Sequence, residues 1–267
     1  MSAHRESRRR RTCLVSLLLI GGAGGCRGDS HERWATPPAP AESIAHSLPV
    51  PELPVRMRAI QPSQLCISLG FSEAVLQKSW VNLQPKVRAT VADSQGQQAA
   101  LSFRYLGPTP GEQPLRSGLF RRQLGLKLLA EDTCNLLYVM WRFDDPSQIA
   151  VSIKRNPDQH LHVECTNHGY HSVRPSWSVP VAAPAPQSVH ELAAHVQESR
   201  LEVSVDGKPV LRADLSAARL PKRGVAGLRS DNVAFELVRF AADLQEVAPP
   251  ESPAPCRPKA SGSEESD

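Results

Sequence analysis

The sequence lacks three common catalytic or metal-binding motifs: a CxxC pair, a Gly-x-Ser-x-Gly pentapeptide and a Glu-x-Asp-x-x-Glu pattern. The first absence argues against a zinc ribbon, whose thiolates come in closely spaced pairs. The second argues against the nucleophile elbow of α/β-hydrolases. The third argues against two carboxylates carried on one strand for glycoside hydrolysis. A Ser/His/Asp triad stays open because its members need not be close in sequence, but we expect binding rather than catalysis.

The chain also lacks a basic stripe and an internal repeat. A nucleic-acid surface needs clustered Lys and Arg, so we expect no nucleic-acid partner, and the sequence implies no cofactor. The formal net charge of +4 comes largely from the N-terminus, where Arg5 and Arg8 to Arg11 are offset only by Glu6. Without these residues the chain is close to neutral.

The apolar run at the N-terminus, Cys13 to Ile20, is too short for a membrane-spanning helix, which needs about 20 apolar residues. It follows the arginines and leads into the small residues Gly21 to Gly25, which is the order of an export signal. We therefore expect residues 1–25 to be removed on export.

The junction Ala23-Gly24-Gly25-Cys26 resembles the lipobox of bacterial lipoproteins, although Ala23 stands where that family usually has Leu. The resemblance implies lipid attachment at Cys26 and a bilayer partner. It also implies a place at the cell membrane or outer membrane, facing the periplasm or the cell surface. The alternative is an ordinary secretory peptide cut near Gly25, which would leave Cys26 as a disulfide partner.

Proline-rich segments flank the centre of the chain. Residues 26–54 and 246–267 lack apolar periodicity, which predicts an extended tether and a disordered acidic tail. The remaining residues 55–245, about 190 of them, suit one domain.

Alternation of apolar and polar residues predicts short strands through this domain. Asp206-Gly207 is a strong hairpin signal, and only residues 71–78 indicate a short helix or an irregular entry segment. Many short strands with few helices predict an all-β antiparallel sandwich or jelly roll. The expected strands cover residues 85–92, 99–105, 118–130, 135–143, 149–155, 160–166, 193–205, 210–214, 225–229 and 233–241.

Four motifs near the C-terminus, His190-Glu191-Leu192, LEVSVDGK from Leu201, GLRSDN from Gly227 and Phe235-Glu236-Leu237, resemble concanavalin A-like domains. These domains include laminin-G-like modules and putative sugar hydrolases acting on keto-disaccharides. The resemblance implies a jelly roll in which the concave sheet or the loops at its rim carry the ligand. The central block CNLLYVMWR…VSIKRNP is similar to predicted lipoproteins of soil bacteria.

The three strands expected over residues 135–166 form a meander with two faces. One face is a predicted core, and the other is polar and resembles a sugar-binding surface; the alternative is a solvated sheet. The predicted core comprises Leu137, Val139, Trp141, Val151, Ile153, Leu161, Val163 and Cys165. The other face carries Met140 and Ser152 together with the candidate ligand-binding residues Tyr138, Arg142, Lys154, His160, His162 and Glu164.

Within this face we expect Lys154 beside His160 or His162. The two histidines and Glu164 offer donors for a divalent ion, but ligands on one strand diverge, so we expect no metal site.

Cys66, Cys134, Cys165 and Cys256 remain after export, and an oxidising compartment favours one or two disulfides. In an up-down-up meander Cys134 and Cys165 lie at opposite edges, about 25 Å apart, whereas a disulfide needs Cα atoms about 6 Å apart. We therefore expect Cys66 to pair with one of them, while Cys256 stays free or pairs externally.

Together these patterns favour a membrane-anchored exported lipoprotein whose sandwich binds a glycan or another envelope ligand. The alternatives are a glycan-modifying hydrolase of the same fold group and a structural envelope protein without a small ligand.

Overall fold

A computed structural model describes residues 57–61, 64–70 and 80–244 of the chain. The predicted export signal, Cys26, the tether, the tail with Cys256 and the helix expected at residues 71–78 lie outside these residues. Within them, no helix is long and apolar enough to cross a membrane.

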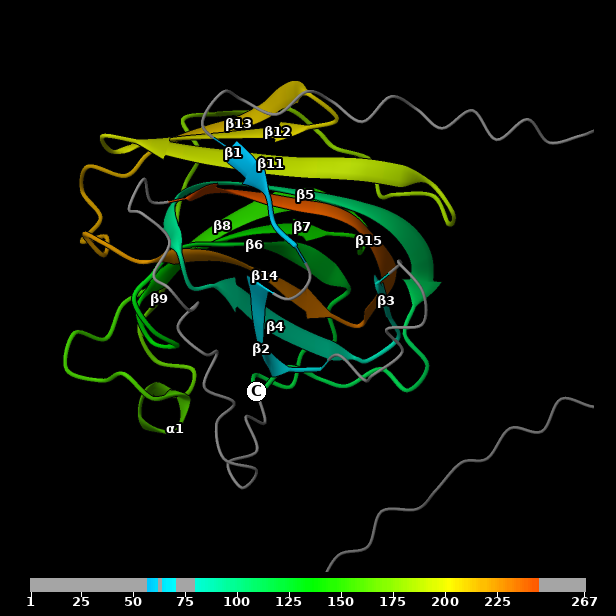
Figure 1. Cartoon of the computed structure of the whole chain (residues 1–267), viewed down its shortest axis with the longest axis horizontal. Coiled ribbons are helices and arrows are strands. Elements are labelled where there is room, and N and C mark those ends of the chain that lie inside the picture. Colours follow the sequence, from blue (N-terminus) through cyan, green and yellow to red (C-terminus); the bar gives the residue numbers. More distant parts are fainter. Residues whose placement is uncertain (1–56, 62–63, 71–79, 245–267) are drawn as a thin grey trace, which may run out of the picture. The chain divides into compact units, whose positions relative to one another are not determined.

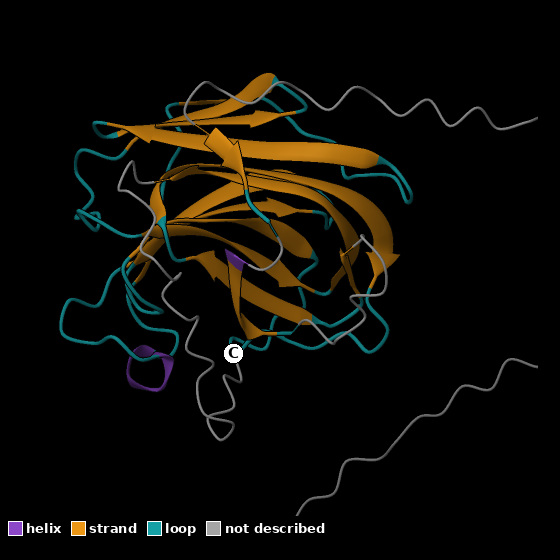
Figure 2. Cartoon of the chain, in the orientation of Figure 1, coloured by secondary structure: helices purple, strands orange, loops and turns teal. Residues whose placement is uncertain are grey.

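Two antiparallel sheets pack face to face (Figures 1 and 2). In the described part of the chain, the eight-stranded sheet runs in the order β1-β15-β5-β11-β12-β13-β10, with β3 also paired to β15. Its strands are β1 (Met57–Ala59), β3 (Trp80–Asn82), β5 (Ser94–Pro108), β10 (Trp177–Ser178), β11 (Val189–Gln197), β12 (Arg200–Val205), β13 (Lys208–Asp214) and β15 (Val233–Leu244).

The seven-stranded sheet of the described residues runs in the order β2-β4-β14-β6-β7-β8-β9. Its strands are β2 (Leu65–Leu69), β4 (Lys86–Val91), β6 (Gln123–Ala130), β7 (Leu136–Arg142), β8 (Gln148–Lys154), β9 (Tyr170–Ser172) and β14 (Val225–Asp231). One short helix, α1 (His162–Cys165), lies between β8 and β9.

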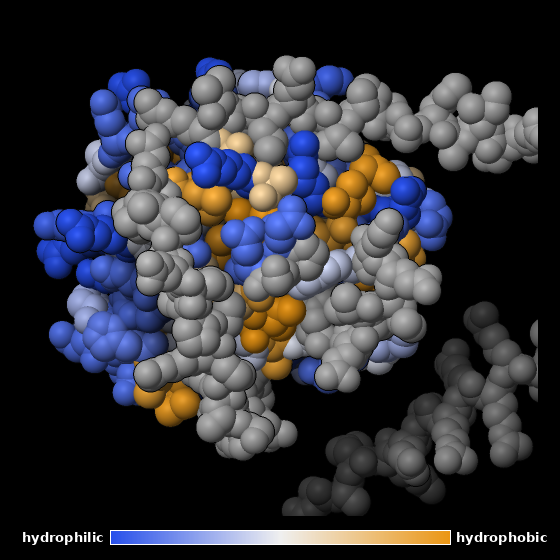
Figure 3. Space-filling view, in the orientation of Figure 1, coloured by the Kyte–Doolittle hydropathy of each residue, from blue (hydrophilic) through white to orange (hydrophobic). Residues whose placement is uncertain are grey.

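The core fills the space between the sheets with alternate side chains from both. Leu126 and Val139 from the seven-stranded sheet, and Leu101 and Leu192 from the eight-stranded sheet, are fully buried. In one view of the surface, apolar side chains gather toward the middle and polar ones along the left edge (Figure 3). The chain crosses repeatedly between the layers, and the expected all-β antiparallel sandwich is confirmed.

Most predicted strands coincide with observed ones. Residues 135–143 and 149–155 correspond to β7 and β8, which pair in register from Leu136↔Lys154 to Arg142↔Gln148. The single strand expected at 193–205 is wrong: a turn at Glu198, whose φ is 55°, splits it into β11 and β12. The chain reverses there because Gln197 pairs directly with Arg200.

The strand expected at residues 160–166 is also wrong. This segment contains α1. The strand that pairs with β8 on the side away from β7 is β9, with Lys154 opposite Tyr170. The Glu164 carboxylate accepts hydrogen bonds of 2.9 Å from the backbone N–H groups of His160 and Leu161, which closes the first helical turn. As a result, Leu161 and Val163, which were expected in the core, are 49% and 66% exposed.

This change reverses the cysteine prediction. Cys134 and Cys165 form a disulfide with Cα atoms 5.8 Å apart. The helix brings Cys165 back over the start of β7. A third strand in its place would have carried Cys165 to the far edge of the sheet. Cys66 is disulfide-bonded as well, but to neither of these two, so its expected pairing is wrong.

Candidate functional site

The structure divides the predicted ligand-binding residues among three places. Tyr138 and Lys154 lie on the outer face of the seven-stranded sheet, where they meet Tyr170 and Arg229; we call these four residues the aromatic–cation cluster. The rings of Tyr138 and Tyr170 stack with centroids 6.1 Å apart. Arg229 Cζ lies 5.0 Å from the Tyr138 ring centroid, and Lys154 Nζ lies 5.2 Å from that of Tyr170.

The aromatic–cation cluster is largely covered. Tyr138, Lys154 and Arg229 are 6%, 1% and 8% exposed. Beside it, Tyr138 and His162 line a hollow of about 20 Å³, which is space for about one water molecule. A sugar ring does not fit into this hollow.

The other predicted residues lie apart from the cluster. His160 and Glu164 are exposed, and Lys154 is not their neighbour because its partner across the sheet is Tyr170. His160 Nδ1 lies 2.6 Å from Asp132 Oδ2, and this hydrogen bond raises the pKa of His160. The backbone N–H groups of Leu161 and His160 lower the pKa of Glu164.

Arg142 lies at the other end of β7, opposite Gln148 and Gln123. Burial and the neighbouring Arg121 lower the pKa of Arg142. The six predicted residues therefore do not converge on one ligand.

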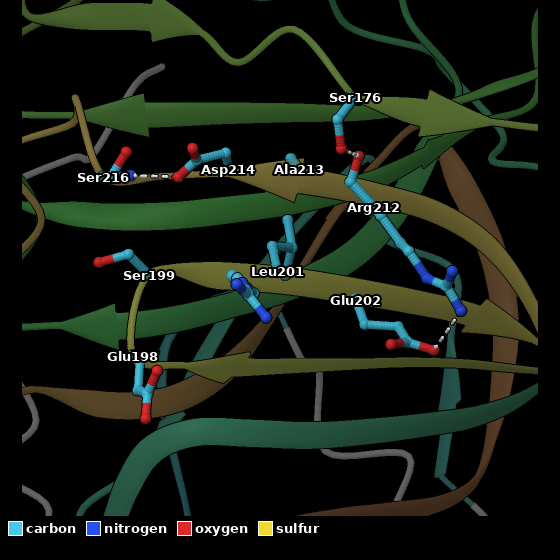
Figure 4. Close-up of a pocket in the computed structure, with 10 residues that line it drawn as sticks. Ser176, Glu198, Ser199, Leu201, Glu202, Arg212, Ala213, Asp214 and Ser216 are labelled. Atoms are coloured by element: carbon cyan, nitrogen blue, oxygen red, sulfur yellow. Dashed lines mark hydrogen bonds and ion pairs between the residues drawn. The ribbon is translucent and has the colours of Figure 1, made fainter.

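A larger hollow lies on the eight-stranded sheet. It is an open hollow of about 700 Å³, and β12 and β13 supply most of its lining (Figure 4). The Arg212 side chain reaches across to Glu202, with Nη2 3.7 Å from Oε1 (Figure 4). The Asp214 carboxylate accepts a 2.8 Å hydrogen bond from the Ser216 N–H. The lining residues are Ser176, Glu198, Ser199, Arg200, Leu201, Glu202, Arg212, Ala213, Asp214 and Ser216.

Strand pairing aligns a row of side chains beside this hollow. His195 is opposite Glu202, Glu202 is opposite Arg212, and Arg212 is opposite Trp177. Residues opposite each other in antiparallel strands point to the same face, so β11, β12, β13 and β10 each contribute one side chain. Arg212 Cζ lies 5.4 Å from the Trp177 ring centroid, and we call these four residues the tryptophan row.

The tryptophan row is accessible. Trp177 is 43% exposed, and the side chains of Arg212 and Glu202 are 57% and 52% exposed. An exposed indole offers an apolar face to a ligand, while a carboxylate accepts and a guanidinium donates hydrogen bonds. This combination can bind a flat ligand with one apolar face and a polar rim.

Sequence patterns did not identify this site. Glu202 and Arg212 occupy alternate polar positions typical of any solvated strand, and β10 has only two residues. The one available signal was Trp177 itself, an aromatic residue within a segment rich in Pro and Ser.

No family model matches the chain, and no curated protein does. Among solved structures, carbohydrate-binding module CBM66 from Bacillus subtilis is similar over 67% of this chain and 96% of that chain, at 10% identity and a TM-score of 0.44. A tetrameric galectin from the sponge Cinachyrella sp. is similar over 60% and 99%, at 14% identity and 0.38.

The Crh5 transglycosylase in complex with NAG is similar over 72% of this chain and 85% of that chain, at 13% identity and a TM-score of 0.40. At these values none of the three likenesses assigns a role to a residue of this chain.

Proposed function

We propose that the chain is an exported lipoprotein, anchored by lipid on Cys26, that binds a glycan in the hollow beside the tryptophan row. The observation that carries the proposal is the alignment of Trp177, Arg212 and Glu202 on neighbouring strands at the edge of a hollow of about 700 Å³. Hollows of about 300–1,000 Å³ are typical of small-ligand sites. The apolar face of a pyranose ring stacks on the indole, and its hydroxyl groups bond to the charged pair.

The charges around the hollow favour a ligand with little net charge. Arg200 is opposite Asp214 and Glu202 is opposite Arg212, so positive and negative side chains alternate and no field of one sign develops. A polyhydroxylated ligand uses both signs, because each hydroxyl group donates one hydrogen bond and accepts others.

The hollow supports binding better than glycoside hydrolysis. Hydrolysis needs one carboxyl group held protonated as a general acid, with a raised pKa. Hydrogen bonds from Ser216 lower the pKa of Asp214, so Asp214 is ionised at neutral pH. Glu202 is ion-paired with Arg212, with Oε1 3.7 Å from Nη2.

A screen for retained glycans tests the binding proposal. We expect the labelled full chain, solubilised in detergent, to be retained by at least one polysaccharide on an array of bacterial envelope glycans, or to sediment with purified peptidoglycan. Retention should be lost on adding excess free oligosaccharide of the same composition. If neither array nor peptidoglycan retains the chain, the proposal is wrong.

Fractionation tests the anchor. We expect the full chain to reside in the membrane fraction and Cys26→Ala to be released, because one diacylglycerol supplies most of the bilayer affinity. Ser117→Ala, a change at an exposed turn residue that leaves every cysteine intact, is the control and should stay in the membrane. A Cys26→Ala protein that remained there would rule out the lipid anchor.

A further inference from the structure

A serine, a histidine and an aspartate are connected by hydrogen bonds near the start of β11. Ser188 Oγ lies 2.8 Å from His190 Nε2, and His190 Nδ1 lies 2.8 Å from Asp206 Oδ2. Ser188 immediately precedes β11, His190 lies near its start, and Asp206 comes from the turn between β12 and β13. Neither the glycan site nor the aromatic–cation cluster uses these side chains.

Backbone contacts fix the aspartate. Asp206 Oδ1 accepts a 2.8 Å hydrogen bond from the Glu191 N–H, and the Asp206 N–H donates to the Glu191 carbonyl at 2.9 Å. Burial acts to raise the pKa of Asp206, but the hydrogen bond from His190 and the Glu191 N–H outweigh it, and the pKa is lowered. An ionised Asp206 favours the proton on Nδ1, which leaves Nε2 of a neutral His190 facing Ser188 as an acceptor.

Aromatic rings hold the imidazole in place. The His190 ring is perpendicular to Trp141, with centroids 5.4 Å apart, and lies 6.3 Å from Phe103. Its side chain is nevertheless 22% exposed. The imidazole is therefore fixed in orientation but still reaches solvent.

The backbone before the serine is strained. Gln187 has φ 69°, a conformation that costs free energy for a residue other than glycine and that is concentrated at functional sites. Arg104 Nη1 donates to the Gln187 carbonyl at 3.2 Å, so positive charge lies one residue from Ser188.

The Ser188 hydroxyl has two acceptors for one proton. Its oxygen lies 2.5 Å from the Ala185 carbonyl oxygen and 2.8 Å from His190 Nε2. When His190 is protonated, Nε2–H donates and the hydroxyl proton goes to Ala185. When His190 is neutral, rotation of the hydroxyl presents its proton to Nε2, which is the arrangement of an activated nucleophile.

We propose that Ser188, His190 and Asp206 form a hydrolytic triad that cleaves esters with a small acyl group. Ser188 Oγ attacks the ester carbonyl and passes its proton to Nε2. The C–O bond to the alcohol then breaks, and the alcohol leaves with that proton. Water attacks the acyl-serine, gives a proton to Nε2, and the acid departs as Oγ regains its proton.

The surroundings define the roles and the substrate class. Ser188 and His190 contact the reacting atoms, while Asp206 is a positioning residue that fixes the tautomer of His190. Arg104 donates to the Gln187 carbonyl beside Ser188 and is also ion-paired with Glu236 at 3.0 Å. The rings of Trp141 and Phe103 are packed into the core, which favours an acetyl group over a long acyl chain.

Covalent labelling with a fluorophosphonate tests the triad directly. We expect the full chain to be labelled, with the modified peptide containing Ser188, and to hydrolyse p-nitrophenyl acetate faster than the octanoate ester. Ser188→Ala should abolish labelling and lower acetate hydrolysis by about 100-fold or more. Ser117→Ala, a change at an exposed serine in a turn, is the matched control and should leave both unchanged.

Asp206→Asn separates positioning from folding, because asparagine also tolerates the φ of 51° at this position. We expect an unchanged circular dichroism spectrum and a rate of acetate hydrolysis lower by about 100-fold or more. A folded wild-type chain that is not labelled at Ser188 would overturn the proposal. So would equal hydrolysis by wild type and Ser188→Ala. Neither result bears on glycan retention.

Discussion

Asp231 holds two buried arginines on the outer face of the seven-stranded sheet. Its carboxylate accepts from Arg88 Nη2 at 2.7 Å and from Arg229 Nε at 2.9 Å. Burial acts to raise the pKa of Asp231, but Arg229 and Arg88 outweigh it and lower the pKa to about 2. The stabilisation of the fold by these two ion pairs is therefore present at neutral pH and is lost only as the pH falls from about 4 toward 2.

We expect Asp231→Asn to lower the free energy of unfolding by about 3–5 kcal/mol at pH 7, because it leaves buried cations without their carboxylate. Denaturant unfolding measures this. Asp158→Asn, at an exposed turn position, is the control and should change stability by less than about 0.5 kcal/mol. Equal midpoints for the two variants would show that the ion pairs do not stabilise the fold.

The pKa of Asp243 is shifted in the opposite direction. It is 6% exposed, and burial outweighs the hydrogen bonds from the N–H groups of Gln97 and Gln98 and raises its pKa to about 6. An acid whose pKa is raised on folding contributes stability below its unfolded pKa, about 4, and loses it as pH rises through the folded value.

Asp243→Asn should remove this pH dependence. We expect the variant to match the wild type near pH 4 and to exceed its free energy of unfolding by up to about 3 kcal/mol above pH 7. Urea titrations at pH 4, 5, 6 and 7 give the difference between the two proteins. A difference that is constant over this range would contradict the raised pKa.

At the scale of elements, α1 depends on tertiary contacts. The bond between Cys134 and Cys165 closes a loop with a sequence separation of 31. Loop-closure entropy for this length gives about 3–4 kcal/mol. We expect the double variant Cys134→Ala/Cys165→Ala to lose about that much stability in denaturant unfolding.

Peptide mapping under non-reducing conditions checks the connectivity. It should recover the peptides containing Cys134 and Cys165 as one linked species. A species joining Cys134 to Cys66 would contradict the structure and would restore the meander expected from the sequence.

The strands could be predicted because their pattern is sustained. β7 is an almost continuous apolar run of seven residues and β8 is a seven-residue run rich in β-branched residues, with turn residues between them, and runs of this length bounded by turns favour strands. His160 to Thr166 alternates, but over so short a run a helical turn fits equally well. The Cys134–Cys165 bond and the Glu164 contacts with the backbone decide between them, and both depend on residues brought together by folding.

The candidate site also depends on residues that only folding brings together, and it could therefore not be predicted. Trp177 meets Arg212 because β10 pairs with β13, and no local pattern indicates that pairing. Tyr138 and Lys154 were correctly placed on the side of the sheet away from the core, but alternation alone does not show whether that side is covered. They are buried, and the accessible site lies on the other sheet.

At the scale of the whole molecule, the two sheets have different outer faces. The seven-stranded sheet carries a covered network of cations, tyrosines and Asp231, whereas the eight-stranded sheet carries an open hollow edged by the tryptophan row. Under the proposed function, the covered face stabilises the fold and the open face binds the ligand. The proposed lipid on Cys26 holds the molecule at a membrane.

The dissociation constant of a retained oligosaccharide, measured by calorimetry for the wild type, Trp177→Ala and Phe120→Ala, tests this account most directly. Phe120 is 60% exposed and provides the matched loss of an exposed aromatic ring. We predict binding weaker by about 10- to 100-fold in Trp177→Ala and unchanged in Phe120→Ala. Equal affinities for the wild type and Trp177→Ala would contradict a glycan site at the tryptophan row.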